Sequence, residues 1–88
     1  MDIDALKNRR RRVVGMRETL KKIAQGTALS VYVAKNADTK VIHDVVTQSQ
    51  ARNIPVEYVD SIDELGRLCG IDVGAACAAL LPDQNEGR

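Results

Sequence analysis

The sequence predicts a small α/β domain in which helices cover both faces of a mixed sheet of about four strands. Segments with apolar residues at helical spacing alternate along the chain with short, mostly apolar runs that are typical of buried strands. The chain has 88 residues, of which 44% are hydrophobic and 28% are charged. This length is enough for one core and too short for two. We therefore expect one domain over residues 1–82 and a flexible tail at residues 83–88.

The first half of the chain contains two predicted helices and two predicted strands. A short, mostly polar helix over residues 3–11 precedes a strand at Val13-Val14. Apolar residues then recur at helical spacing over residues 16–24, and Gly26 is placed to end that helix. Residues 29–34 form an almost continuous apolar run, as expected for a strand buried on both faces at the centre of the sheet.

The second half adds a helix, a strand, a short helix and a last strand. The helix has to end near Arg52, since Asn53-Ile54-Pro55 disfavours its continuation. Ser61 and Glu64 have the spacing of a capping box, which predicts the start of the short helix. The predicted ranges are residues 41–52, 56–59, 61–70 and 76–81.

The charge is unevenly distributed along the chain, although the formal net charge is only +1. Residues 1–40 contain ten Lys and Arg against four Asp and Glu, whereas residues 41–88 contain three against eight. One face can therefore be basic and suit nucleic acid. There is no Phe or Trp, and Tyr32 and Tyr58 are the two tyrosines, so recognition of bases by stacking on aromatic side chains is disfavoured.

Several classes of protein are disfavoured by what the sequence contains. Cys69, Cys77 and the one histidine, His43, are too few for a disulfide framework or a zinc site, so we expect reduced thiols and no metal or cofactor. No signal peptide or membrane span is evident, which predicts a cytoplasmic protein without membrane contact. There is also no Gly-rich phosphate loop and no nucleophile beside a base, so we expect no catalytic residues and no enzyme.

The segment from Val13 to Lys22 points to RNA. A short strand breaks at Gly15, and a helix opens that carries Arg17, Glu18 and Lys21. The glycine permits close approach of another backbone, and the free N–H groups of the first helical turn suit a phosphate or an electronegative base edge. A phosphate-binding surface gains nothing from a carboxylate, but Glu18 can accept a hydrogen bond from a base. We therefore expect this helix start to read bases as well as backbone.

Four blocks of the sequence closely resemble the kink-turn-binding ribosomal protein superfamily, in particular its small bacterial members of the YbxF type. The blocks occur in the family's order and cover roughly residues 13–81. They are GMRETLK at residues 15–21, VYVAKNAD at 31–38, NIPV at 53–56 and ELGRLCGIDVGAA at 64–76.

The resemblance implies a three-layer α-β-α sandwich that binds kink-turns, the sharply bent internal loops of RNA built on tandem sheared G·A pairs. It places the helix start at the G·A pairs, and it places residues 71–75 as an apolar loop against a nucleotide flipped out of the bulge. Lys35 and Asp38 lie in a neighbouring loop and support both the helix start and the apolar loop. The implied partner is structured RNA, such as ribosomal RNA or a riboswitch, bound by a monomer. The RNA-binding residues on this basis are Gly15, Arg17, Glu18, Lys21, Lys22, Lys35, Asp38, Ile71, Asp72, Val73, Gly74 and Ala75.

Two residues depart from the archaeal and eukaryotic members, which usually carry asparagine at the position of Arg17 and proline at that of Gly74. An arginine can still donate to guanine, but the set of hydrogen bonds differs. The glycine leaves the loop more conformational freedom to lose on binding. We therefore expect weaker binding than in the archaeal ribosomal members.

Simpler interpretations stay open. The run Arg9–Arg12 is typical of a solvated charged segment that adds phosphate attraction without reading sequence. Glu18 could pair with a lysine three or four residues on, as in any polar helix face, and Ile71 and Val73 could be core residues. The alternative functions are a protein–protein module of ribosome assembly that docks non-specifically on ribosomal RNA, and a small α/β enzyme that uses Cys69 or Cys77.

Overall fold

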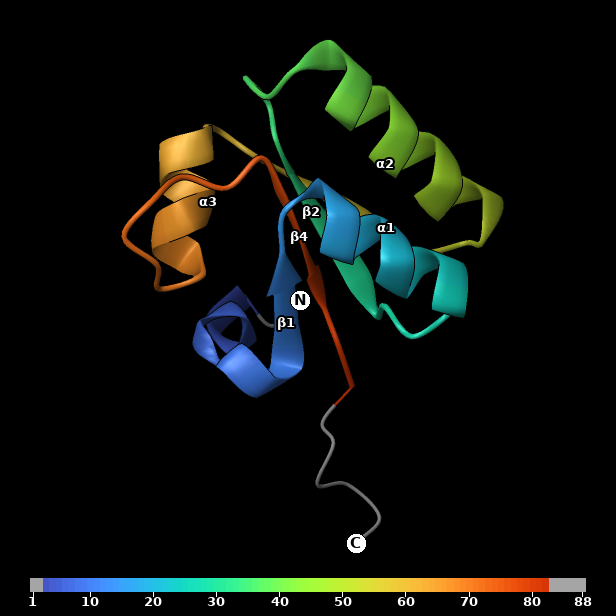
Figure 1. The fold of residues 1–88 in the computed structure, drawn as a ribbon, viewed down its shortest axis with the longest axis horizontal. Helices are drawn as coiled ribbons and strands as arrows, with labels where there is room; N and C mark the ends of the chain where they lie inside the picture. Colours follow the sequence, from blue (N-terminus) through green and yellow to red (C-terminus); the bar gives the residue numbers. More distant parts are fainter. Residues whose placement is uncertain (1–2, 83–88) are drawn as a thin grey trace, which may run out of the picture.

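The computed structural model describes residues 3–82, which form a mixed four-stranded sheet between two helical layers (Figure 1). The predicted fold class is confirmed. The tail expected at residues 83–88 lies outside the described part of the chain. The elements in chain order are η1 (Ile3–Lys7), η2 (Arg9–Arg11), β1 (Arg12–Val14), α1 (Met16–Gln25), β2 (Ser30–Ala34), α2 (Thr39–Ala51), β3 (Val56–Val59), α3 (Ile62–Leu68) and β4 (Cys77–Leu80).

The strand order is β1-β4-β2-β3. β4 is antiparallel to both of its neighbours, and β2 is parallel to β3. β1, β2 and β3 therefore all run the same way and finish at one end of the sheet, where β4 begins. We call this the C-terminal end of the sheet. β2 is buried at every position, as predicted for a central strand.

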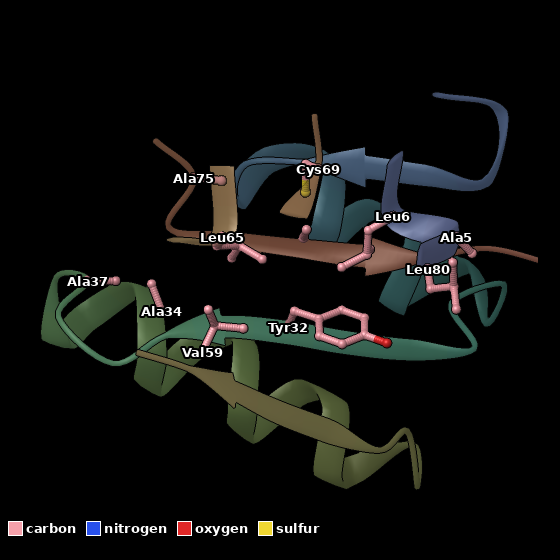
Figure 2. Packing of buried hydrophobic residues seen from close by; sticks show 11 residues of the cluster. Ala5, Leu6, Tyr32, Ala34, Ala37, Val59, Leu65, Cys69, Ala75 and Leu80 are labelled. Atoms are coloured by element: carbon pink, nitrogen blue, oxygen red, sulfur yellow. The ribbon is translucent and has the colours of Figure 1, made fainter. Parts of the chain in front are cut away.

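Side chains alternate across the sheet and form one apolar cluster on each face, as strand geometry requires. Val31 and Val33 of β2 pack with Ile23 of α1 and Val45 of α2. On the other face, Tyr32 packs with side chains of η1 and α3, as Figure 2 shows. The residues of this second cluster labelled there are Ala5, Leu6, Tyr32, Ala34, Ala37, Val59, Leu65, Cys69, Ala75 and Leu80.

The helix boundaries follow the local signals in the sequence. Gly26 ends α1 in the left-handed conformation, with φ of 74°, a region that glycine adopts without steric cost. The Asp38 side chain caps α2 by accepting from the Lys40 N–H over 2.9 Å. The Ser61 hydroxyl caps α3 by accepting from the Glu64 N–H over 3.0 Å, as the capping-box spacing predicts.

The N-terminal segment is the element that the sequence pattern described least well. The single helix expected over residues 3–11 is two short 3-10 helices that meet at Asn8. The Asn8 side chain accepts from the Arg10 N–H over 3.0 Å and so starts a new turn. Asparagine side chains compete in this way with a continuous helix. Ala5 and Leu6 are buried and anchor the segment on the sheet.

Candidate nucleic-acid interface

Three of the predicted site segments meet at the C-terminal end of the sheet. The Gly15 N–H donates to the Cys77 carbonyl oxygen over 2.9 Å, which joins the start of α1 to the start of β4. The Ala34 N–H donates to the carbonyl oxygen of Ala76 over 2.9 Å, so the turn after β2 lies next to the same point. We call residues 69–76, which connect α3 to β4, the α3–β4 loop.

The start of α1 depends on a glycine. Gly15 has φ of 95° and ψ of 160°, a conformation that is essentially restricted to glycine. A Cβ atom at this position would meet no other atom within 4 Å, so the requirement is conformational and the space above Gly15 is open. No side chain caps α1, in contrast to α2 and α3. The first-turn N–H groups of α1 therefore have neither an intrahelical bond nor a side-chain cap.

The polar face of α1 carries charges that are not paired with one another. Arg17, Glu18 and Lys21 are exposed, and Lys22 is half-buried. The ion pairs within residues 3–82 are Lys35–Asp60, Lys40–Asp44 and Arg67–Glu64. The pairing of Glu18 with a lysine of its own helix is therefore not present in the described chain, and its carboxylate remains open to another donor.

The α3–β4 loop exposes one of its two branched aliphatic side chains. The Val73 side chain is 70% exposed, whereas Ile71 is half-buried and packs against the core cluster of Figure 2. Asp72 and Gly74 are also exposed. Ala75 was expected among the binding residues, but its side chain is buried in the same cluster and its N–H donates to the carbonyl oxygen of Ile62 over 3.0 Å. Any part that Ala75 has in binding is therefore through the main chain.

Contacts with α3 fix the conformation of this loop. The Ile71 N–H donates to the Gly66 carbonyl oxygen over 3.1 Å. A Cβ atom on Gly66 would overlap the Val73 carbonyl oxygen, and a Cβ atom on Gly74 would overlap Cγ2 of Ile62. Both glycines thus allow close packing between helix and loop. α3 constrains the loop even though position 74 is glycine and not proline.

The turn after β2 has mainly structural contacts. The Lys35 ammonium pairs with the Asp60 carboxylate over 3.3 Å, with both side chains largely exposed, and Asp38 is the cap of α2. Sequence reasoning missed Asn36, whose Oδ1 accepts from the Ile62 N–H over 2.8 Å and ties the turn to α3. The sequence gives little indication of this contact, because an asparagine in a turn usually forms its hydrogen bonds within the turn.

The arginine run is not uniformly solvated. Arg9 and Arg10 are exposed, as expected for a solvated segment. Arg11 and Arg12 are half-buried, and their guanidinium groups donate to main-chain carbonyl oxygens. Those bonds are Arg11 Nε to Leu81 at 3.4 Å, Arg12 Nε to Leu6 at 3.1 Å and Arg12 Nη2 to Cys69 at 3.1 Å.

The two cysteines are buried and free. Burial raises the pKa of the Cys69 thiol, and the Arg12 guanidinium opposes part of that rise. Burial also raises the pKa of the Cys77 thiol, with the Thr19 hydroxyl opposing. Within residues 3–82 no three His, Cys, Asp or Glu side chains lie close enough to hold a metal ion, and no helix there is long and apolar enough to cross a membrane.

The fold and the surface together define a small α-β-α domain that presents an uncapped, mixed-charge helix start beside an exposed aliphatic loop. The chain belongs to the ribosomal protein L7Ae/L30e/S12e/Gadd45 family, whose sequence model matches residues 2–86.

Curated relatives and solved structures agree with this membership. An RNA-binding protein of Halalkalibacterium halodurans is 46% identical over 68 residues, which are 77% of this chain and 83% of that protein. The RNA-binding protein YbxF of Geobacillus stearothermophilus is 41% identical over 69 residues, 78% of this chain and 84% of the relative. The 15.5kD RNA binding protein of Giardia lamblia has the same fold, with a TM-score of 0.84 at 22% identity, covering 97% of this chain and 72% of the other.

Proposed function

We propose that this chain is a non-enzymatic RNA-binding protein that recognises and stabilises kink-turns. The observation that carries the proposal is the unpaired Glu18 carboxylate between Arg17 and Lys21 on an uncapped helix start. This helix start is bonded to Cys77, the residue that directly follows a loop that exposes Val73. The RNA-binding relatives within the same family support it.

The helix start supplies the polar part of the proposed recognition. Glu18 accepts hydrogen bonds from the amine and ring N–H of a guanine in the G·A pairs, while Arg17 and Lys21 donate to guanine acceptors or to phosphates. The positive end of the helix dipole and the first-turn N–H groups add attraction for the same region of the RNA. The outward-facing groups at this end of α1 are of the kinds that such contacts need.

The α3–β4 loop supplies the apolar part. Val73 packs against the base of the nucleotide that the bulge extrudes, and the exposed main chain at Gly74 lets the nucleotide approach closely. Because α3 already holds the loop, little of its conformational entropy is lost on binding. The bound protein then shifts the RNA from its extended to its bent conformer, since it binds the bent form better.

The proposal has the protein act as a monomer within a ribonucleoprotein in the cytoplasm. The large hydrophobic side chains exposed in the described chain are Leu29, Tyr58 and Val73. They come from three separate segments of the chain, and scattered single residues of this kind do not form an interface between copies.

A binding titration with two matched RNAs tests the function. One RNA contains a kink-turn, and in the other the tandem G·A pairs are replaced by Watson–Crick pairs with the stems unchanged. We expect at least tenfold tighter binding to the kink-turn, corresponding to about 1.4 kcal/mol or more. Equal affinity for both RNAs would contradict the proposal and favour a module that docks on RNA without reading its structure.

A further inference from the structure

A second basic surface lies outside the helix start. It consists of Lys7, Arg9 and Arg10, which we call the basic turn. All three side chains are exposed, and none takes part in the ion pairs of residues 3–82. The three charges lie within four residues, so positive charge is concentrated in this segment.

The basic turn is an ordered element. The Asn8 side chain caps η2 by accepting from the Arg10 N–H, and the Arg11 N–H donates to the Asn8 carbonyl oxygen over 2.9 Å. Arg11 and Arg12 bind main-chain carbonyl oxygens of distant segments, as described above. The two neighbouring arginines thus fix the backbone that carries the exposed charges, which reduces the entropy lost when those charges bind a partner.

Lys7 of the basic turn lies at the beginning of the α3–β4 loop. The Arg12 guanidinium binds the Cys69 carbonyl oxygen over 3.1 Å. A Cβ atom on Gly70 would lie 3.7 Å from Cγ of Lys7, so the two residues are in contact range. At the other end of the loop, the next residue, Cys77, is bonded to Gly15 at the start of α1. Lys7 and the start of α1 therefore lie at the two ends of the loop, no more than about 25 Å apart along its length. Arg9 and Arg10 precede β1 and lie at the opposite end of that strand from Gly15.

We infer that the basic turn binds the phosphate backbone of an RNA stem that flanks the kink-turn, with Arg9 and Arg10 as the contacts. This inference rests on the proposed function. In this inference, the G·A pairs lie on α1, the bulged nucleotide lies on Val73, and the flanking stem continues past the loop toward the basic turn. An anionic membrane fits less well, because the apolar side chains of this segment, Ala5 and Leu6, are buried and cannot insert into lipid.

The test compares two protein variants on RNAs that differ in stem length. Arg9→Gln/Arg10→Gln removes two charges from the basic turn, and Arg52→Glu removes the same net charge at the end of α2. The RNAs carry the same kink-turn with stems of either a full helical turn or a few base pairs. Affinity is measured at several salt concentrations, and circular dichroism confirms that each variant is folded.

The inference predicts a loss that depends on the stem. Arg9→Gln/Arg10→Gln should weaken binding to the long-stem RNA roughly tenfold at low salt and reduce the slope of log K against log salt by about two. Binding of the short-stem RNA should be unchanged, and Arg52→Glu should bind both RNAs as the unmodified protein does.

Other outcomes overturn the inference. If Arg9→Gln/Arg10→Gln loses equal affinity for both RNAs, or if Arg52→Glu loses as much affinity, these arginines act only through net charge. If the double variant loses no affinity, they do not act in binding at all. Binding to phosphatidylserine vesicles that needs Arg9 and Arg10, with RNA binding unaffected, would assign the basic turn to a membrane. A plain RNA duplex of equal length separates failure of this inference from failure of the proposed kink-turn recognition. If Arg9→Gln/Arg10→Gln weakens binding of the duplex, the basic turn contacts phosphates whether or not the protein recognises kink-turns. If the double variant binds the duplex as the unmodified protein does, the phosphate contact is excluded.

Discussion

The main-chain N–H of Gly15 donates to the carbonyl oxygen of Cys77 over 2.9 Å. This bond joins the start of α1 to the strand that follows the α3–β4 loop, so it links the two parts of the proposed interface. Each part can be altered separately, because Glu18 and Val73 are both exposed and neither side chain supports the core.

Replacing Glu18 by alanine tests whether the carboxylate reads a base. We expect Glu18→Ala to weaken kink-turn binding by about 1–3 kcal/mol and to affect binding of an unstructured RNA far less. Glu57→Ala is the matched control, because it removes an exposed carboxylate from the edge strand β3. Tighter kink-turn binding by Glu18→Ala in gel-shift titrations would show that the carboxylate only repels RNA.

Replacing Val73 by serine tests the apolar contact. Val73→Ser should weaken kink-turn binding by about 1–2 kcal/mol, as expected for loss of a partly buried aliphatic group. It should leave the salt dependence unchanged, whereas Lys21→Ala should reduce the slope by about one. Because Val73 is 70% exposed in the free protein, the melting temperature of the Val73→Ser variant should be close to that of the unmodified protein. Normal RNA binding combined with a sharply lower melting temperature would identify Val73 as a core residue.

The packing of Gly74 against Ile62 predicts a coupled loss of stability. Gly74→Ala places a Cβ atom into Cγ2 of Ile62, and overpacking of this kind costs about 1–3 kcal/mol. Ile62→Ala removes the overlapping atom, so the double variant should lose less stability than the two single losses added together. Urea unfolding of all four proteins measures this coupling. Strictly additive losses would show that the loop moves freely away from α3.

Arg12 and Arg10 should differ in their effect on folding. Arg12→Gln loses guanidinium bonds to the carbonyl oxygens of Leu6 and Cys69, and we expect the free energy of unfolding to fall by about 1–3 kcal/mol. Arg10→Gln removes an exposed side chain with no such bond and should be nearly neutral. Thermal or urea unfolding checks the pair. Equal stability of the two variants would mean that the Arg12 bonds contribute nothing.

The buried thiols predict a loss of stability at alkaline pH. The pKa of Cys69 and of Cys77 is raised above the ordinary value of 9.0, chiefly by burial. The folded protein then holds protons that the unfolded chain releases, so this stabilisation is complete below pH 9 and is lost as the pH rises through the folded pKa values. The difference in unfolding free energy between the unmodified protein and Cys69→Ala/Cys77→Ala should shrink over that range. A constant difference would contradict the prediction.

The sequence was sufficient for most elements of the fold because their signals are local. Gly26 and Ser61 mark the end of one helix and the start of another through their own backbone and side-chain chemistry. The apolar run of β2 predicts its central position, since both faces of that strand are covered.

The rest depends on contacts between residues distant in the chain. In the sequence Arg12 is one of four consecutive arginines, but the Cys69 carbonyl oxygen to which its guanidinium donates is 57 residues away. Ala75 lies in a loop whose burial follows from packing against α3, and strand alternation does not extend into such a loop. The placement of RNA contacts on Gly15, Glu18 and Val73 stays a prediction.

The most direct test is an NMR titration of isotope-labelled protein with kink-turn RNA, in which the chemical shifts of the backbone amides are measured. The largest changes should occur at Gly15, Arg17 and Glu18 and, in the α3–β4 loop, at Val73 and Gly74. The amides of β3, at the far edge of the sheet, should stay unchanged. Changes concentrated on β3 or α2, with the start of α1 and the loop unaffected, would contradict the proposed mode of recognition.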